Sequence, residues 1–133
     1  MGFKELLGWH RVYGEILVSA NDVERAIAWY GRVFDLVAAW HRKGQTEIPM
    51  GYGQQGDMEP IVTLVAIPVG SNEAAVGSHP VLFTKRLETV HRNLIAKGVN
   101  TGPIQSDSGG NRFFEFLDCE GNRVEVCLEP GSR

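Results

Sequence analysis

The hydrophobic and polar positions of the chain change their period several times, and each change marks an expected element. Residues 14–19 begin with a glycine, contain the apolar run Ile16-Leu17-Val18 and are followed by a polar turn, which is typical of a strand. After them, apolar residues recur at helical spacing up to Phe34, so an amphipathic helix follows directly. Asn21 and Glu24 have the spacing of a capping box, which predicts that Asn21 caps this helix.

Three more strands and a linker are expected after this helix. Residues 36–41 and 47–52 predict a hairpin, in which Pro49 indicates an edge position or a bulge. Residues 61–66 form the next run of β-branched and apolar side chains and predict a further strand. Residues 68–78 are polar and rich in Gly, Ser and Asn, which is typical of a linker.

The same order of elements then starts again. The expected elements are a strand at residues 80–83, a helix with Leu87, Val90 and Leu94 on its apolar face that ends at Gly98, and strands at residues 99–104, 112–117 and 123–128. Between the last two strands, Glu120-Gly121-Asn122 is typical of a tight hairpin turn. The chain therefore repeats one strand–helix–strand–strand–strand unit. We expect a single domain over residues 1–133, with module one at about 10–68, a linker at about 69–77 and module two at about 78–129.

Aligning the two copies pairs specific polar residues. Glu15 stands as far before the head of the first helix as His79 stands before the head of the second. In the fourth strand of each copy, Thr63 matches Glu125. These four residues occupy corresponding places in a duplicated unit, so they are the first candidates for a shared site.

Composition and charge narrow the classes of function. The 133 residues are 43% hydrophobic and 22% charged, as in an ordinary globular domain, and the net charge is −3. A mildly acidic chain is poorly suited to holding a phosphate backbone, so we expect no nucleic acid partner. No apolar run approaches the ~20 residues that span a bilayer, and residues 1–7 lack a signal-peptide core. Cys119 and Cys127 form no CxxC pair, and we expect free thiols in the cytoplasm.

Three stretches together resemble one superfamily. Residues 18–30 form a strand followed by a helix that contains Trp29-Tyr30, and residues 79–99 repeat this passage. Residues 116–126 are similar to a closing hairpin that usually contains Asp-Pro-Asp-Gly-Asn. They resemble the vicinal oxygen chelate proteins, which include glyoxalase, extradiol dioxygenases and bleomycin resistance proteins. The resemblance implies an α+β fold in which two βαβββ modules form an open, cup-like mixed barrel, and it implies a homodimer.

The resemblance also implies a site. In metal-dependent members, the positions that match Glu15, Thr63, His79 and Glu125 supply ligands from the inner strand faces. Two carboxylates and one imidazole suit a divalent metal such as Fe, Mn, Ni, Co or Zn, whereas Thr63 is a poor neutral ligand. Glu125 or Glu15 would then act as a base. We therefore expect a small-molecule enzyme of glyoxalase or dioxygenase type, a lyase or an oxidoreductase, with Glu15, His79 and Glu125 on the metal.

Two alternatives remain open. The protein could instead be a metal-free ligand-binding or drug-sequestering protein of the bleomycin resistance kind. Glu15 lies in an apolar strand, so a partner such as Arg112, Arg123 or His79 could neutralise it in place of a metal. The other histidines, His10, His41 and His91, are expected to be surface or structural residues, and Tyr30 is expected in the core.

Overall fold

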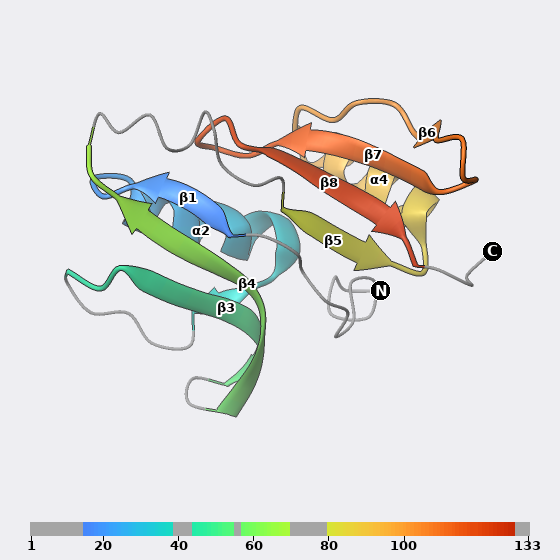
Figure 1. Cartoon of the computed structure of the whole chain (residues 1–133). Helices are drawn as coiled ribbons and strands as arrows, with labels where there is room; N and C mark the ends of the chain where they lie inside the picture. Colours follow the sequence, from blue (N-terminus) through green and yellow to red (C-terminus); the bar gives the residue numbers. More distant parts are fainter. Residues whose placement is uncertain (1–14, 39–43, 55–56, 70–79, 130–133) are drawn as a thin grey trace.

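Two modules lie side by side, each with a four-stranded sheet and one helix (Figure 1). The computed structural model describes residues 15–38, 44–54, 57–69 and 80–129. The elements are β1 (Ile16–Ser19), α2 (Val23–Phe34), β2 (Val37–Ala38), β3 (Glu47–Gln54), β4 (Asp57–Ile67), β5 (Val81–Thr84), α4 (Leu87–Ala96), β6 (Gln105–Ser106), β7 (Arg112–Leu117) and β8 (Arg123–Leu128). The predicted α+β class with two βαβββ modules is confirmed.

Both sheets are mixed and share one topology. The strand orders are β1-β4-β3-β2 and β5-β8-β7-β6. In each sheet the first strand pairs in parallel with the last strand of its module, and the remaining pairs are antiparallel. The two parallel registers begin with Ile16 opposite Leu64 and with Val81 opposite Glu125. The structure therefore reproduces the duplication that the sequence predicted.

Two details of the predicted elements are wrong. The first helix begins at Val23 and its N-cap is Asp22, which makes no side-chain capping bond, so Asn21 is not the cap. The strand predicted at residues 99–104 is absent among the described strands; Thr101 makes a single bridge to Phe116, and β6 comes later. Pro103 explains the shift, because proline has no N–H to donate to a strand ladder. Residues 70–79, most of the predicted linker, lie outside the described residues.

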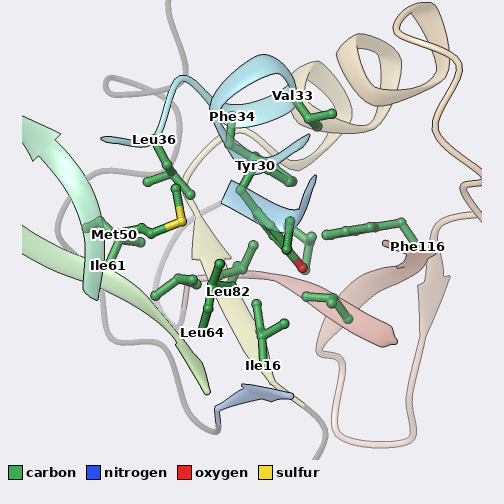
Figure 2. Close-up of a cluster of buried hydrophobic side chains, with 14 of the residues drawn as sticks. Ile16, Tyr30, Val33, Phe34, Leu36, Met50, Ile61, Leu64, Leu82 and Phe116 are labelled. Atoms are coloured by element: carbon green, nitrogen blue, oxygen red, sulfur yellow. The ribbon is translucent and has the colours of Figure 1, made fainter. Parts of the chain in front are cut away.

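One hydrophobic core joins the two modules. Alternate strand residues such as Ile16, Leu64 and Leu82 are buried and cluster with Tyr30 and Phe116 (Figure 2). This alternation is the period of a strand with one face against a helix. Across the modules, Phe116 of β7 packs against two aromatic rings of α2, with its ring centroid 6.2 Å from that of Trp29 and 5.4 Å from that of Phe34. In the described part of the chain, neither helix has the length and hydropathy of a membrane span.

Candidate functional site

Each sheet has a face that the described helices leave uncovered. Figure 1 shows α2 behind β1 and α4 behind β7 and β8, and the buried residues of the strands form one cluster with the buried residues of these helices. Because side chains alternate along a strand, the residues between the buried ones point to the opposite side. We call this side the helix-free face. In the second sheet its half-buried residues are Val81, Phe83, Phe113, Glu115, Glu125 and Cys127, and in the first sheet they are Leu17, Ser19, Pro49, Thr63 and Val65.

Glu125 lies at the centre of the helix-free face of the second sheet. The register places Val81 opposite it on β5 and Glu115 opposite it on β7. Two residues further along β8, Cys127 lies between Phe83 and Phe113 in the same way. A half-buried carboxylate is therefore bordered by apolar and aromatic side chains.

A thiol holds one oxygen of this carboxylate. Cys127 Sγ donates a hydrogen bond to Glu125 Oε2 at 2.8 Å. Burial, and then this bond to Glu125, raise the pKa of Cys127 to about 12. The thiol is therefore protonated at neutral pH, so it is a hydrogen-bond donor and not a nucleophile. It engages Oε2 and leaves Oε1 of Glu125 available to a ligand.

Glu115 is a site residue that the sequence interpretation missed. It lies directly opposite Glu125, and its Oε2 is 4.0 Å from Nε of Arg123. The hairpin turn at Gly121 could have revealed it, because the turn fixes which residues of β7 and β8 face each other. Two carboxylates thus lie side by side on one strand pair. Glu125 accepts the thiol of Cys127, whereas Glu115 lies near the guanidinium of Arg123.

The other predicted site residues are distributed over both modules. Glu15 is exposed and precedes the Ile16–Leu64 pair, so it is level with Thr63 on the neighbouring strand. Because Glu15 is exposed, its carboxylate needs no partner to offset burial. The two arginines named as its possible partners lie elsewhere: Arg112 pairs with Glu88 at 2.7 Å, and Arg123 lies beside Glu115. His79, like His10 and His41, lies outside the described residues.

The described residues alone do not fit a metal ion. No group of three or more His, Cys, Asp and Glu side chains within residues 15–38, 44–54, 57–69 and 80–129 is arranged to hold one. Thr63 is neutral, and Oε2 of Glu125 already accepts the Cys127 thiol. The ligand set of Glu15, His79 and Glu125 therefore stays a prediction.

His91 and Tyr30, which were not expected in the site, have structural roles. Nε2 of His91 is 2.8 Å from the carbonyl oxygen of Gly102, and its ring meets that of Phe114 edge-on at 4.8 Å. His91 is thus a half-buried structural residue of the α4–β7 contact. Tyr30 is fully buried, as expected, and its hydroxyl donates to Asp118 Oδ2 at 2.6 Å.

The fold defines the class of the protein: a duplicated βαβββ domain whose two sheets each have one helix-free face. The sequence model of the Glyoxalase/Bleomycin resistance protein/Dioxygenase superfamily matches residues 12–126. The chain belongs to this superfamily. Among curated proteins, none matches the sequence significantly.

Solved structures of low sequence identity share the fold. A superfamily member from Sphaerobacter thermophilus is 18% identical and has a TM-score of 0.60, with 88% of this chain and 97% of that chain covered. Lactoylglutathione lyase from Agrobacterium tumefaciens is 17% identical with a TM-score of 0.61, covering 87% and 92%. A bleomycin-binding protein complexed with bleomycin is 14% identical with a TM-score of 0.65, covering 89% and 98%. At these identities the likeness concerns the fold alone.

Proposed function

We propose that this protein binds a small molecule on the helix-free face of the second sheet, as a metal-free ligand-binding protein of the bleomycin resistance kind. The observation that supports this proposal is the half-buried carboxylate of Glu125 with Val81 and Glu115 opposite it and Phe83 and Phe113 beside it. Apolar walls with a few polar groups that converge on one point are typical of small-molecule sites.

The charge of the face defines the class of ligand. Glu115 and Glu125 are both acidic, and one basic residue, Arg123, lies two positions before Glu125 on β8 with its Nε 4.0 Å from Glu115 Oε2. A negative charge in surroundings less polar than water attracts a cation more strongly than an exposed charge does. The rings of Phe83 and Phe113 favour an aromatic or aliphatic body and also attract cations. The ligand we propose therefore has an ammonium, guanidinium or amidinium group next to an apolar part, and this group donates to Oε1 of Glu125.

Ligand-induced thermal shifts test this function. Benzamidine and metal-free bleomycin serve as probes, because benzamidine joins a cation directly to an aromatic ring and bleomycin is the ligand in one structural neighbour. We expect at least one of them to raise the melting temperature of the wild type, and Glu125→Gln to abolish the shift. Glu88→Gln is the matched control, since Glu88 is an exposed carboxylate of the same module. If neither probe shifts the wild type, or Glu125→Gln responds like the wild type, the proposal fails.

A metal-dependent enzyme of glyoxalase or dioxygenase type is the second candidate. It is supported by the position of Glu15 level with Thr63, the residue that matches Glu125 in the first module, and by the half-burial of Glu125. In this case Glu15, His79 and Glu125 would hold a divalent metal such as Fe, Mn, Ni, Co or Zn, and Glu125 or Glu15 would be the base.

Metal analysis discriminates the two candidates. The enzyme hypothesis predicts metal in gently purified protein, or a rise in melting temperature on adding Mn, Ni, Zn, Co or Fe(II) that Glu125→Gln abolishes. Metal-free protein with no response to any of these ions contradicts the enzyme hypothesis and leaves the ligand-binding proposal in place.

We also propose a homodimer in a reducing compartment such as the cytoplasm. Edge strands such as β2 and β6 leave backbone groups that can pair with a second chain, which supports self-association. The free thiols of Cys119 and Cys127 support the compartment. Light scattering in solution tests the dimer, and a monomer at all concentrations would contradict it.

A further inference from the structure

The turn between β7 and β8 lies against the edge of β1, in the other module. Asn122 Nδ2 donates to the carbonyl oxygen of Leu17 at 2.8 Å, and the backbone N–H of Ser19 donates to Glu120 Oε1 at 3.1 Å. β1 is the edge strand of its sheet, so among the described strands these backbone groups have no partner on that side. Two side chains of the turn thus take the place of a neighbouring strand.

The turn is held rigidly by Asp118. This carboxylate is buried, with 7% of its surface exposed. Its Oδ1 accepts the backbone N–H groups of Glu120 and Asn122, each at 2.9 Å, and its Oδ2 accepts Asn122 Nδ2 at 3.0 Å and the Tyr30 hydroxyl. Gly121 has a φ of 80°, a conformation that most other residues adopt only with strain. The turn is therefore anchored to α2 before it reaches β1.

The place of the turn connects it to the proposed site. Asn122 is followed directly by β8, which contains Glu125, whereas Leu17 lies on the helix-free face of β1, close to Glu15. β1 and β8 point in opposite directions (Figure 1), so both Glu15 and Glu125 lie away from the turn on the same side of it. The bonds that Glu120 and Asn122 make therefore contribute, beside the shared core, to the position of β1 relative to Glu125.

We infer that Glu120 and Asn122 are positioning residues of the ligand site, which fix the helix-free face of the first module beside Glu125. The inference rests on the proposed function, because it assumes that a ligand contacts Glu125. The hydrogen bonds of Asn122 and Glu120 to the backbone of β1 hold this strand in place, and the ion pair of Glu120 with Arg25 does not. Arg25 is largely exposed, and exposed ion pairs contribute little.

Three variants separate these contributions. Glu120→Ala removes the acceptor of the Ser19 N–H, and Glu120→Gln retains the acceptor but loses the charge. Arg25→Ala leaves the Ser19 bond in place and removes the ion pairs of Arg25 with Glu120 and with Asp22. We expect Glu120→Ala to speed amide hydrogen exchange at Ser19 at least tenfold, because an unprotected edge amide exchanges readily. We expect Glu120→Gln and Arg25→Ala to exchange like the wild type.

Two further readouts make the inference falsifiable with or without a ligand. Residual dipolar couplings of β1 and β8 amides should show that Glu120→Ala changes the orientation of one module relative to the other. The affinity for benzamidine should fall about fivefold in Glu120→Ala and recover in Glu120→Gln. Unchanged couplings in Glu120→Ala overturn the inference whatever binds, and so do changed couplings with an unchanged benzamidine affinity. If the wild type binds metal-free bleomycin and not benzamidine, the affinity is measured with bleomycin. If it binds neither probe, the failure belongs to the proposed function, and the couplings alone decide whether Glu120 positions β1.

Discussion

The helix-free faces of the two modules differ in chemistry although their strands follow one plan. In the first sheet the half-buried positions are Leu17, Ser19, Pro49, Thr63 and Val65, none of which is charged. In the second sheet the face contains two carboxylates, one thiol and two phenylalanines. Among these half-buried positions, only those of the second sheet combine the charge and the aromatic rings that can recognise a cationic ligand.

The modules also differ in what they contribute to each other. The second supplies Phe116 to the rings of α2 and Asp118 to the hydroxyl of Tyr30. It also supplies Lys97, whose Nζ donates to the carbonyl oxygen of Val33 at 2.6 Å, near the end of α2. Contacts with the second module thus extend along α2 from Arg25 to Val33. One module therefore contains both the candidate site and many of the groups that join the two halves.

Removing the aromatic ring shared by the modules should have the largest effect. Phe116→Ala should lower the free energy of unfolding by about 3–5 kcal/mol, because it leaves a cavity between β7 and α2. Urea denaturation measures this loss. Phe113→Ala is the matched control on the same strand, and because Phe113 is half-buried on the helix-free face it should lose much less. Equal losses would contradict a core that joins the modules through Phe116.

Removing the hydrogen bond between Tyr30 and Asp118 should have the second-largest effect on the free energy of unfolding. Tyr30→Phe should lower the free energy of unfolding by about 1.5–3 kcal/mol, the range for a hydrogen bond to a charged group. Burial, and then the charge of Asp118, raise the pKa of Tyr30 well above its usual value of 10.0. A raised pKa in the folded state means that this contribution is present below pH 10 and is lost as the pH rises beyond it.

Urea titrations between about pH 7 and pH 11 measure that dependence, since this range extends to either side of the usual tyrosine pKa. The wild type should lose stability toward the alkaline end, and the difference from Tyr30→Phe should shrink there. If the difference in free energy of unfolding between the wild type and Tyr30→Phe stays constant from about pH 7 to about pH 11, the pKa of Tyr30 is not raised in the folded protein.

Neutralising one residue of the acidic pair in the second sheet should have the smallest effect on the free energy of unfolding, and it should be stabilising. Glu115→Gln should raise the free energy of unfolding by about 0.2–1 kcal/mol, because like charges directly opposite each other on paired strands are destabilising. Urea denaturation of this variant beside Glu88→Gln, an exposed carboxylate outside the pair, tests it. Destabilisation by Glu115→Gln would mean that its contact with Arg123 outweighs the repulsion from Glu125.

Local patterns in the sequence were enough to predict several features of the fold. The apolar stripe of α2, the alternation along β7 and β8 and the duplication itself depend on residues close together in the chain, and the structure confirms them. Glu125 was selected as a candidate because it matches Thr63 in the duplicated pattern, and its role stays a prediction. Asn21 was misplaced by one residue as the cap, since capping depends on the backbone conformation at the junction and not only on residue type.

The features that could not be predicted depend on contacts between distant residues. Glu115 becomes a site residue only through its register with Glu125. Asp118, Glu120 and Asn122 look like an ordinary hairpin turn, and nothing near them in the sequence indicates that they bind Leu17, Ser19 and Tyr30. The thiol of Cys127 was expected only to be free, and strand alternation places it on the same face as Glu125 and within hydrogen-bond reach.

Ligand binding by the second module around Glu125 can be located by NMR chemical-shift mapping. Titration of ¹⁵N-labelled protein with benzamidine should perturb amides of Val81, Phe83, Phe113, Glu115, Glu125 and Cys127. We expect much smaller changes at Leu17 and Thr63, and no perturbation of this set in Glu125→Gln. Perturbations centred on the first sheet, or a wild-type spectrum that is unchanged both at saturating benzamidine and at saturating metal-free bleomycin, would show that Glu125 is not the centre of the ligand site.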